Sequence, residues 1–482
     1  MTSKNAESIR IKELTPAMKA EEARLEAQRC LYCYDAPCIQ ACPTHIDIPK
    51  FIRQISTRNL TGSAVTILEA NAMGHSCARV CPVEALCEGA CVYLGWHEKP
   101  IEIARLQRAA TDDFNQGISA SRIDAASLFS RSPLNGKKAA VVGSGPAGLS
   151  CALYLARLGY GVTVFEKRDK PGGLNTYGIA EYKMAQATAL EEARLVRAMG
   201  VEIKTGVAVG RDISPKALEA QFDAVFIGVG LAGTHPLNVP GEDLAGVFDA
   251  LTFIRHIKDR EYSRIPPGKT TVVIGAGNTA IDAVTQAKRT GTPRVIMAYR
   301  RGQKEMPAYA YEFELAKKDE IEFLWNAAPV RILGRKKVEG IELARTERKG
   351  GALSLIPGSE FTVACYRVIG AIGQSKHAAF LKTLPAIELD SSGKIKVDAK
   401  TLRTTNPKYF AGGDAINGGR EVVNAAADGK RAAWGIHQAL TGQKTPPPEH
   451  EYWISTIEGR LVSPPKDLHN DPHGQKRQKI RA

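Results

Sequence analysis

Between residues 139 and 372, short apolar runs alternate with segments in which apolar residues recur at helical spacing. The runs AAVVG, GVTVFE, AVFIGVG, TTVVIG and RVIMAY are rich in β-branched residues, as buried strands are. Helical segments follow at 149–158 and 280–289. Strands that alternate with helices are typical of parallel βαβ units. We therefore expect an α/β fold in this part of the chain.

The two ends of the chain have different patterns. Before residue 118 there are helical segments such as 17–28 and 101–110, with little strand signal. After residue 401 the pattern returns to one strand, 409–411, and one helix, 422–440. The predicted division is a helical domain (1–118), a linker (119–135), the first part of one nucleotide-binding domain (136–265), a second nucleotide-binding domain (266–372), the remainder of the first (373–444) and an irregular tail (445–482).

The composition describes an ordinary globular protein. The 482 residues are 44% hydrophobic and 24% charged, and this length suits about three domains. The longest apolar stretches, near 139–156 and 224–241, are interrupted by Gly and Pro, so we expect no membrane span. The N-terminus has no apolar signal segment, and we expect a cytoplasmic protein.

The formal net charge of +14 permits binding to nucleic acid or to an acidic protein. Lys and Arg are spread along the chain, apart from a short basic run at 476–479. We therefore expect a solvated surface that steers acidic partners, and no nucleic-acid binding.

The cysteines indicate metal chemistry. Eight of the ten lie before residue 92: Cys30, Cys33, Cys38, Cys42, Cys77, Cys81, Cys87 and Cys91. Crowded thiols in a chain without a secretory signal favour metal over disulfides. Thiolates at this short spacing suit iron–sulfur clusters, and zinc is the redox-inert alternative. The isolated Cys151 and Cys365 are expected to be small buried residues.

A first glycine motif joins strand 139–142 to the next helix. Gly143 permits a tight turn, Gly145 lets the backbone approach a pyrophosphate, and Gly148 allows close packing of helix on strand. The next strand ends at Glu166, whose carboxylate can accept hydrogen bonds from ribose hydroxyls. Gly173 follows, where the backbone must again come close to a ligand. Together these features predict a dinucleotide site.

A second motif of the same kind contains Gly275 and Gly277 and is followed by Asn278 and Thr279. Its next strand, 294–298, leads to Arg300 and Arg301 instead of an acid. Arginines can pair with a 2′-phosphate, which an acidic residue would repel. The sequence therefore favours NADPH over NADH at this site.

A third segment, Gly412-Gly413-Asp414, follows strand 409–411 and completes the first nucleotide domain after the second has been inserted. This chain order resembles the flavin disulfide-reductase-like superfamily, which implies two nested dinucleotide-binding, Rossmann-like domains. The resemblance implies FAD at Gly143, Gly145, Gly148, Glu166, Gly173 and Asp414, and NAD(P)H at Gly275, Gly277, Asn278, Thr279, Arg300 and Arg301.

The cysteine region resembles the N-terminal domain of dihydropyrimidine dehydrogenase and, less closely, the glutamate synthase small subunit. The matching segments are Asp35–Cys38, Cys42–Ile48, Cys81–Cys91 and Ile101–Gln107. The resemblance implies one [4Fe-4S] cluster on Cys30, Cys33, Cys38 and Cys91, and a second on Cys42, Cys81, Cys87 and the side-chain oxygen of Gln107, with Cys77 as a packing thiol. One departure is Lys183, which stands where that family usually has an arginine near the flavin.

The function implied is electron input. NAD(P)H would reduce FAD, and two [4Fe-4S] clusters would conduct electrons to a separate FMN and iron–sulfur subunit that reduces uracil or thymine to the 5,6-dihydropyrimidine. No residue of this chain is expected to act as an acid or base on the pyrimidine. The alternatives are a glutamate synthase small subunit or a related NAD(P)H:ferredoxin-type oxidoreductase, and a non-enzymatic zinc scaffold.

Overall fold

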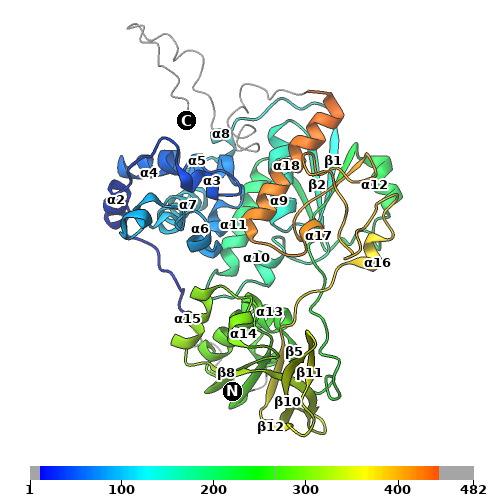
Figure 1. The fold of residues 1–482 in the computed structure, drawn as a ribbon. Helices are drawn as coiled ribbons and strands as arrows, with labels where there is room; N and C mark the ends of the chain where they lie inside the picture. Colours follow the sequence, from blue (N-terminus) through cyan, green and yellow to red (C-terminus); the bar gives the residue numbers. More distant parts are fainter. Residues whose placement is uncertain (1–10, 266, 444–482) are drawn as a thin grey trace.

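The computed structural model describes residues 11–265 and 267–443, so the predicted irregular tail lies outside the described residues. Figure 1 shows an upper part, in which a helical N-terminal domain lies beside a first sheet, and a lower part built on a second sheet. Within the described ranges, no helix has the length and apolar character needed to cross a membrane.

The N-terminal domain is helical. Its helices are α2 (Ala20–Gln28), α3 (Pro37–Ala41), α4 (Ile48–Ser56), α5 (Leu60–Ala70), α6 (Gly74–Val80) and α7 (Ile103–Ser119), with 3₁₀ turns η1 (Val83–Ala85) and η2 (Val92–Trp96). Asp47 and Asn59 cap α4 and α5 by accepting hydrogen bonds from Lys50 N and Gly62 N. Phe51 and Phe114 are fully buried between these helices.

The predicted linker is packed against both neighbouring domains. It contains the short helix α8 (Ala125–Leu128). Phe129 meets Phe114 of α7 edge to face, with 6.3 Å between ring centroids. The guanidinium of Arg157 lies 5.7 Å from the Phe129 ring. The linker therefore helps to hold the helical domain against the first sheet.

The first sheet is parallel, with strand order β14-β4-β1-β2-β3. Its strands are β1 (Lys138–Val142), β2 (Gly161–Glu166), β3 (Glu202–Thr205), β4 (Ala224–Ile227) and β14 (Tyr409–Ala411). Its helices are α9 (Pro146–Arg157), α10 (Leu174–Tyr177), α11 (Gln186–Ala198), α12 (Pro215–Gln221), α16 (Ala378–Leu381), α17 (Asp414–Asn417) and α18 (Val422–Thr441). The chain thus returns to this sheet after building the second one, as the sequence predicts.

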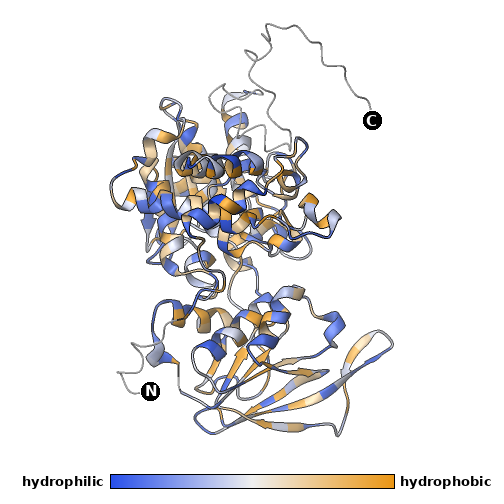
Figure 2. Cartoon of the chain, turned by 90° about the vertical axis from the view of Figure 1, so that its left-hand side faces the viewer, coloured by the Kyte–Doolittle hydropathy of each residue, from blue (hydrophilic) through white to orange (hydrophobic). Residues whose placement is uncertain are grey.

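The second sheet is also parallel, with order β5-β13-β6-β7-β8. Its strands are β5 (Val247–Asp249), β6 (Thr270–Ile274), β7 (Arg294–Tyr299), β8 (Glu322–Trp325) and β13 (Arg367–Gly370). Its helices are α13 (Ala250–Lys258), α14 (Asn278–Arg289) and α15 (Ala310–Lys318), with η3 (Tyr262–Arg264) and η4 (Gln303–Glu305). In Figure 2 the strands of this lower sheet are largely hydrophobic, and β6 is buried throughout.

Two features of the lower part differ from the sequence analysis. Strand β5 pairs with β13, so residues 247–258 belong with the second sheet and not with the first domain, where the predicted boundary at 265 placed them. An antiparallel sheet also interrupts the parallel pattern. It contains β9 (Ala327–Leu333), β10 (Gly340–Lys349), β11 (Ala352–Leu355) and β12 (Phe361–Ala364), at the lower edge of Figure 1.

The N-terminal segment connects the two parts of the molecule. Leu14 N donates to Tyr182 O over 2.7 Å, and Ile11 packs against the core of the lower part. Arg108 of α7 pairs with Glu13 over 2.7 Å and donates to Thr15 O. Residues 11–15 therefore tie the helical domain to the lower part.

Candidate functional site

A cavity of about 620 Å³ runs between the two nucleotide-binding domains. Eight of the predicted site residues line it: Gly143, Gly145, Glu166, Gly173, Lys183, Asn278, Thr279 and Asp414. Gly148, Gly275, Gly277, Arg300 and Arg301 do not line it. The first motif and the start of α14 thus share one cavity, and the basic pair after β7 lies apart from it.

The glycines of the first motif form a cradle that larger residues would fill. Gly173 has φ +57°, and a Cβ there would lie 2.7 Å from Gly145 Cα. A Cβ on Gly145 would meet nothing closer than 4.0 Å, so its backbone faces open space. A Cβ on Gly148 would collide with the carbonyl oxygen of Gly143, because α9 begins tightly against β1. These positions fit a dinucleotide pyrophosphate at the start of α9.

Two acids stand at separate places along this cavity. Glu166, at the end of β2, accepts from Ser144 Oγ over 2.6 Å and from Arg168 N over 2.8 Å. Asp414, at the start of α17, accepts from Arg420 N over 3.0 Å. Burial raises the pKa of Asp414, and the nearby acids Asp428 and Glu421 raise it further. Both side chains are positioned to accept hydrogen bonds from ligand hydroxyls.

The second motif has the geometry of a nucleotide-binding turn. Gly275 has φ +134°, a conformation that favours glycine, and a Cβ on Gly277 would meet nothing within 4 Å. Arg300 and Arg301 directly follow β7, where Arg300 is exposed and Arg301 is partly buried. Arg301 Nε is buried without a hydrogen-bond partner in the described structure. The pair is available for a phosphate.

Lys183 joins the two domains at the cavity wall. Its Nζ lies 2.7 Å from Asp282 Oδ1 of α14 and 2.5 Å from Glu312 Oε1 of α15. Tyr182 Oη donates to Asp282 over 2.8 Å. Lys183, which stands in place of the family's arginine, therefore forms interdomain ion pairs and also lines the cavity.

The eight N-terminal cysteines surround two small cavities. Cys30, Cys33, Cys38 and Cys91 line the first, and Cys42, Cys77, Cys81, Cys87 and Gln107 line the second. Among the described residues, no three His, Cys, Asp or Glu side chains are arranged to hold a single metal ion. The two groups match the two ligand sets that the family resemblance implies, with Cys77 added to the second.

Gln107 and Cys77 are held differently in the second cavity. Gln107 is buried on α7, and its Nε2 donates to Gly74 O over 2.6 Å. Because this bond uses the amide nitrogen, the carbonyl oxygen Oε1 is the atom of this side chain that could act as a ligand. Cys77 Sγ accepts from Asn71 Nδ2 over 3.2 Å, so its thiol has a protein partner.

The thiols lie in surroundings that oppose their ionisation. Burial raises the pKa of Cys38 to about 12, and burial together with neighbouring thiols raises the pKa of Cys87. Because metal ligands bind as thiolates, positively charged iron must offset this cost. Lys430 of α18 is also buried near this region, where its Nζ donates to Thr44 O and Ala70 O over 2.8 and 2.9 Å.

The three cavities adjoin one another through single residues. Val80 lines the main cavity and the next residue, Cys81, lines the second cysteine cavity. In the same way, Val422 lines the main cavity and Val423 lines the second cysteine cavity. Ile48 lines both cysteine cavities. The main cavity, the second cysteine cavity and the first therefore lie next to one another in this order.

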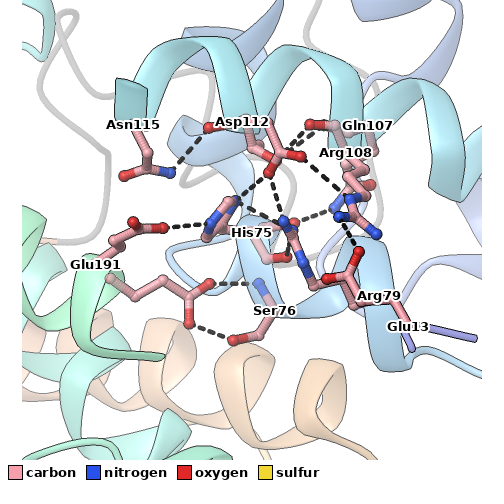
Figure 3. Close-up of polar contacts among 12 residues, drawn as sticks. Glu13, His75, Ser76, Arg79, Gln107, Arg108, Asp112, Asn115 and Glu191 are labelled. Carbon is pink, nitrogen blue, oxygen red and sulfur yellow. Dashed lines mark hydrogen bonds and ion pairs between the residues drawn. The ribbon is translucent and has the colours of Figure 1, made fainter. Parts of the chain in front are cut away.

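A polar network attaches α6, which contributes to this wall, to α7 and α11 (Figure 3). His75 Nε2 lies 2.9 Å from Glu191, and Arg79 Nη2 lies 2.5 Å from Asp112. Arg108 Nε donates to the same Asp112 over 3.1 Å. The network holds α6 against both the helical domain and the first nucleotide domain.

Several residues of the main cavity were not predicted from sequence. They are Asn175, Tyr309, Tyr311, Arg420 and Glu421. Tyr309 Oη donates to Glu421 over 2.8 Å, which joins the lower part to the start of α18. These residues belong to no glycine motif, and only the long-range fold brings them to the cavity. The position of Asn175 two residues after Gly173 is the one local signal that indicates a site residue.

Comparison with known proteins follows the same division of the chain. Residues 7–118 match the family described as dihydropyrimidine dehydrogenase domain II, 4Fe-4S cluster, and residues 135–429 match the pyridine nucleotide-disulphide oxidoreductase family. The first match favours iron–sulfur clusters over zinc.

Among curated proteins, the chain is 36% identical over 444 residues to the glutamate synthase [NADPH] small chain of Halomonas elongata, covering 88% of this chain and 92% of that protein. It is 35% identical over 433 residues to the NAD-dependent dihydropyrimidine dehydrogenase subunit PreT of Salmonella typhimurium, covering 89% and 97%. Among solved structures, Mycobacterium tuberculosis FprA in complex with NADPH has a TM-score of 0.53 at 19% identity, covering 72% of this chain and 97% of FprA.

The fold and these matches define an NAD(P)-dependent flavin and iron–sulfur oxidoreductase. The predicted fold class is confirmed: two nested dinucleotide-binding domains follow a helical iron–sulfur domain. The chain belongs to the pyridine nucleotide-disulphide oxidoreductase family, in the group that includes the dihydropyrimidine dehydrogenase subunits and the glutamate synthase small chains. Sequence identity does not separate these two kinds of relative.

Proposed function

We propose that this chain is the NAD(P)H-oxidising subunit of a dihydropyrimidine dehydrogenase, and that it passes electrons through FAD and two [4Fe-4S] clusters to an FMN-containing partner. The observation that carries the proposal is the series of three adjoining cavities, which leads from the nucleotide domains to the N-terminal cysteines. The flavin, when bound, supplies the conversion of a hydride into single electrons.

In this proposal the residues of the chain bind and insulate the cofactors. The cradle at Gly145 and Gly173 holds the FAD pyrophosphate, while Glu166 and Asp414 accept hydrogen bonds from its hydroxyls. Asn278 and Thr279 begin α14 at the cavity and position the nicotinamide nucleotide, and Arg300 with Arg301 selects NADPH. Lys183, held between Asp282 and Glu312, keeps the two domains together beside the flavin.

The cysteine groups define the proposed clusters. Cys42, Cys81, Cys87 and Gln107 hold the cluster beside the flavin, because their cavity adjoins the main cavity at Val80 and Cys81. Cys30, Cys33, Cys38 and Cys91 hold the outer cluster. The thiols require a reducing compartment, which supports a cytoplasmic location.

The proposed exit for electrons is a surface that we name the apolar collar: Leu31, Tyr34, Leu94 and Trp96. Tyr34 is 87% exposed and Trp96 is 61% exposed, although large aromatic side chains are usually buried. The collar residues flank Cys30, Cys33 and Cys91 in the sequence. A redox partner that covers the collar would exclude water beside the outer cluster, and we propose the FMN subunit as its occupant.

The terminal acceptor is tested by purification with the partner. We expect a complex with an FMN subunit, and we expect NADPH to reduce uracil only when both subunits are present. The competing function is that of the glutamate synthase small chain, which an equally similar relative favours. A glutaminase-bearing partner, with NADPH-dependent glutamate formation and no uracil reduction, would establish the competing function.

The input half of the proposal has its own test. We expect the anaerobic, reconstituted chain to contain flavin and two clusters and to lose visible absorbance when NADPH is added. A colour that NADPH leaves unchanged would contradict electron input, whatever the terminal acceptor.

A further inference from the structure

A buried carboxylate lies beside the wall between the main cavity and α6, and the electron route above does not use it. Glu192 of α11 is 2% exposed. Its Oε1 accepts from Ser76 N over 2.7 Å, and its Oε2 accepts from Ser76 Oγ over 2.5 Å. Figure 3 shows both bonds at Ser76, on the same helix as the network of His75 and Arg79.

Ser76 connects this carboxylate to a residue of the main cavity. Asn175 Nδ2 donates to Ser76 Oγ over 3.0 Å, and Asn175 lines the cavity. The hydroxyl hydrogen of Ser76 is directed to Glu192, so its oxygen can only accept from Asn175. The charge on Glu192 therefore determines which end of the Asn175 amide is directed to Ser76.

The other end of that amide is unsatisfied. Asn175 is 2% exposed, and its Oδ1 has no hydrogen-bond partner in the described part of the chain. A buried oxygen without a hydrogen-bond partner has a free-energy cost. A donor on a bound cofactor would remove this cost. Asn175 and Val80 line the same cavity, and Val80 precedes Cys81, so this wall is the one that electrons must cross.

We propose that Asn175, Ser76 and Glu192 form a hydrogen-bonded switch that binds a proton at Glu192 when the flavin in the cavity is oxidised and releases it when the flavin is reduced. The switch rests on the proposed function, because it requires a flavin whose ring lies at this wall. It concerns residues outside the glycine motifs and the cysteine sets.

The hydrogen bonds and charges balance in both states. Reduced flavin has a ring N–H donor where the oxidised ring has an acceptor nitrogen. With Glu192 ionised, Asn175 offers Oδ1 to that donor. On oxidation of a bound flavin, two electrons would pass to the clusters and one proton would leave the ring. Glu192 binds one proton and donates it in a hydrogen bond to Ser76 Oγ. The hydroxyl hydrogen of Ser76 then turns to Asn175 Oδ1. The Asn175 amide is thereby reversed and offers Nδ2 to the ring. No net proton passes to the solvent.

The charged groups around Glu192 permit this change. Burial raises its pKa to about 7, although the bonds from Ser76 and the charge of Arg79 act in the opposite direction. Arg79 is itself paired with Asp112, and His75 is paired with Glu191. Arg79 therefore does not form its closest ion pair with Glu192, and burial lowers the pKa of His75. The carboxyl group is therefore able to change its charge near neutral pH.

The test is the pH dependence of the flavin midpoint potential in the holoprotein, measured by spectroelectrochemistry without partner or nicotinamide. For the wild type, we expect a potential that is nearly constant between about pH 6 and pH 8, because proton uptake by the flavin is balanced at Glu192. In Glu192→Gln and in Ser76→Ala, we expect the midpoint potential to fall as the pH rises, with the slope that corresponds to one proton per two electrons. Glu191→Gln, a change at the adjacent carboxylate, should behave as wild type.

A wild-type slope of one proton per two electrons would overturn the switch, as would a constant potential in both Glu192→Gln and Ser76→Ala. Infrared difference spectra give a second measurement. Oxidation should produce a carboxylic-acid C=O band that is lost in Glu192→Gln and kept in Glu191→Gln, and absence of this band in the wild type would also overturn the switch. Protein without flavin absorbance would instead contradict the proposed function itself.

Discussion

Gln107 shows how much a single residue can depend on its surroundings. On helical periodicity alone it is an ordinary residue of α7, yet it is buried and lines the second cavity together with four cysteines. Its Nε2 donates a hydrogen bond to Gly74 O, which fixes the amide and, in our proposal, directs Oε1 to the cluster. A neutral carboxamide in place of a thiolate removes one negative charge from a cluster and alters its potential.

We predict that Gln107→Ala lowers the iron and sulfide content towards one cluster per chain, and that Gln107→Cys keeps two clusters and lowers the potential of the inner one. Iron analysis and EPR-monitored redox titration measure both effects. Asn115→Ala is the control, because Asn115 is a buried amide on the same helix that bonds only to Thr111 O in the described structure and lines neither cysteine cavity. An unchanged EPR spectrum in Gln107→Ala would show that Gln107 is no ligand.

Arg300 and Arg301 determine the choice of nucleotide in our proposal. Loss of hydrogen bonds to a charged phosphate costs about 1.5–3 kcal/mol, which corresponds to roughly 10–100-fold in affinity. We predict that the double change to Ala raises the KM for NADPH by about this factor and leaves the KM for NADH nearly unchanged. Steady-state kinetics with an artificial acceptor measures both constants.

The matched control is Arg294→Ala at the other end of β7, where Arg294 is exposed and pairs with Glu322 over 2.8 Å. This change should affect neither nucleotide. Equal increases in KM for NADPH and NADH in the double variant would mean that the arginines do not contact a 2′-phosphate.

At the scale of elements, the contact between α6 and α11 should make stability depend on pH. Glu192 has a pKa raised by burial from about 4.5 to about 7. The folded protein therefore binds this proton more tightly than the unfolded chain does. Through this group, the free energy of unfolding is highest at low pH and falls as the pH rises across that interval.

We predict that the urea midpoint of Glu192→Gln depends less on pH than that of the wild type. The stability of the variant relative to the wild type should be greatest near pH 8. Urea unfolding of wild type and variant at about pH 5 and pH 8 measures this difference. Glu314→Gln, at an exposed position of α15, should leave the pH dependence as in wild type. A parallel shift of Glu192→Gln at both pH values would contradict the prediction.

Elements with strong local patterns were predictable from sequence. The strands that begin both glycine motifs, the helices that follow them and the return of the chain at 409–411 occur as expected, because glycine turns and buried β-branched runs are local signals. Strand β5 was not predicted, and the predicted boundary at 265 left its residues with the first domain, because only pairing with β13 determines the place of a three-residue strand. The antiparallel sheet of β9 to β12 was missed for a similar reason.

The same distinction applies to the sites. Gly145, Glu166 and Asp414 were predictable as cavity residues because each lies at, or within three residues after, the end of a strand. Asn175 and Glu421 were not, because the fold brings them to the cavity from segments without a motif. Nothing in the sequence alone indicates that Ser76 connects the cavity residue Asn175 to the buried acid Glu192.

At the scale of the whole molecule, the apolar collar is the surface through which electrons leave in our proposal. Central aromatic residues of an interface often contribute 2 kcal/mol or more, which is about 30-fold in affinity. We predict that Tyr34→Ser with Trp96→Ser weakens binding of the partner subunit by at least this factor. Flavin reduction by NADPH should keep its wild-type rate. Stopped-flow absorbance and partner titration separate the two measurements.

Tyr366→Ser provides the control for the collar, because Tyr366 is 49% exposed on the lower part, far along the chain from the N-terminal cysteines. This variant should bind the partner as wild type does. Loss of flavin reduction in the collar variant would indicate damage to the fold, and unaltered partner affinity would place the exit elsewhere.

The late return of the chain to its first sheet has a consequence for biosynthesis. Strand β14 and helix α18 leave the ribosome after the whole lower part, yet α18 packs along α9 and supplies Val422 and Val423 to the wall between cavities. All strands of the inserted domain precede β14 in the chain, so this domain can fold while translation continues. A nascent chain stopped before residue 409 would therefore contain a finished nicotinamide domain and an open flavin domain. Flavin capture must therefore wait until β14 and α18 have also been synthesised.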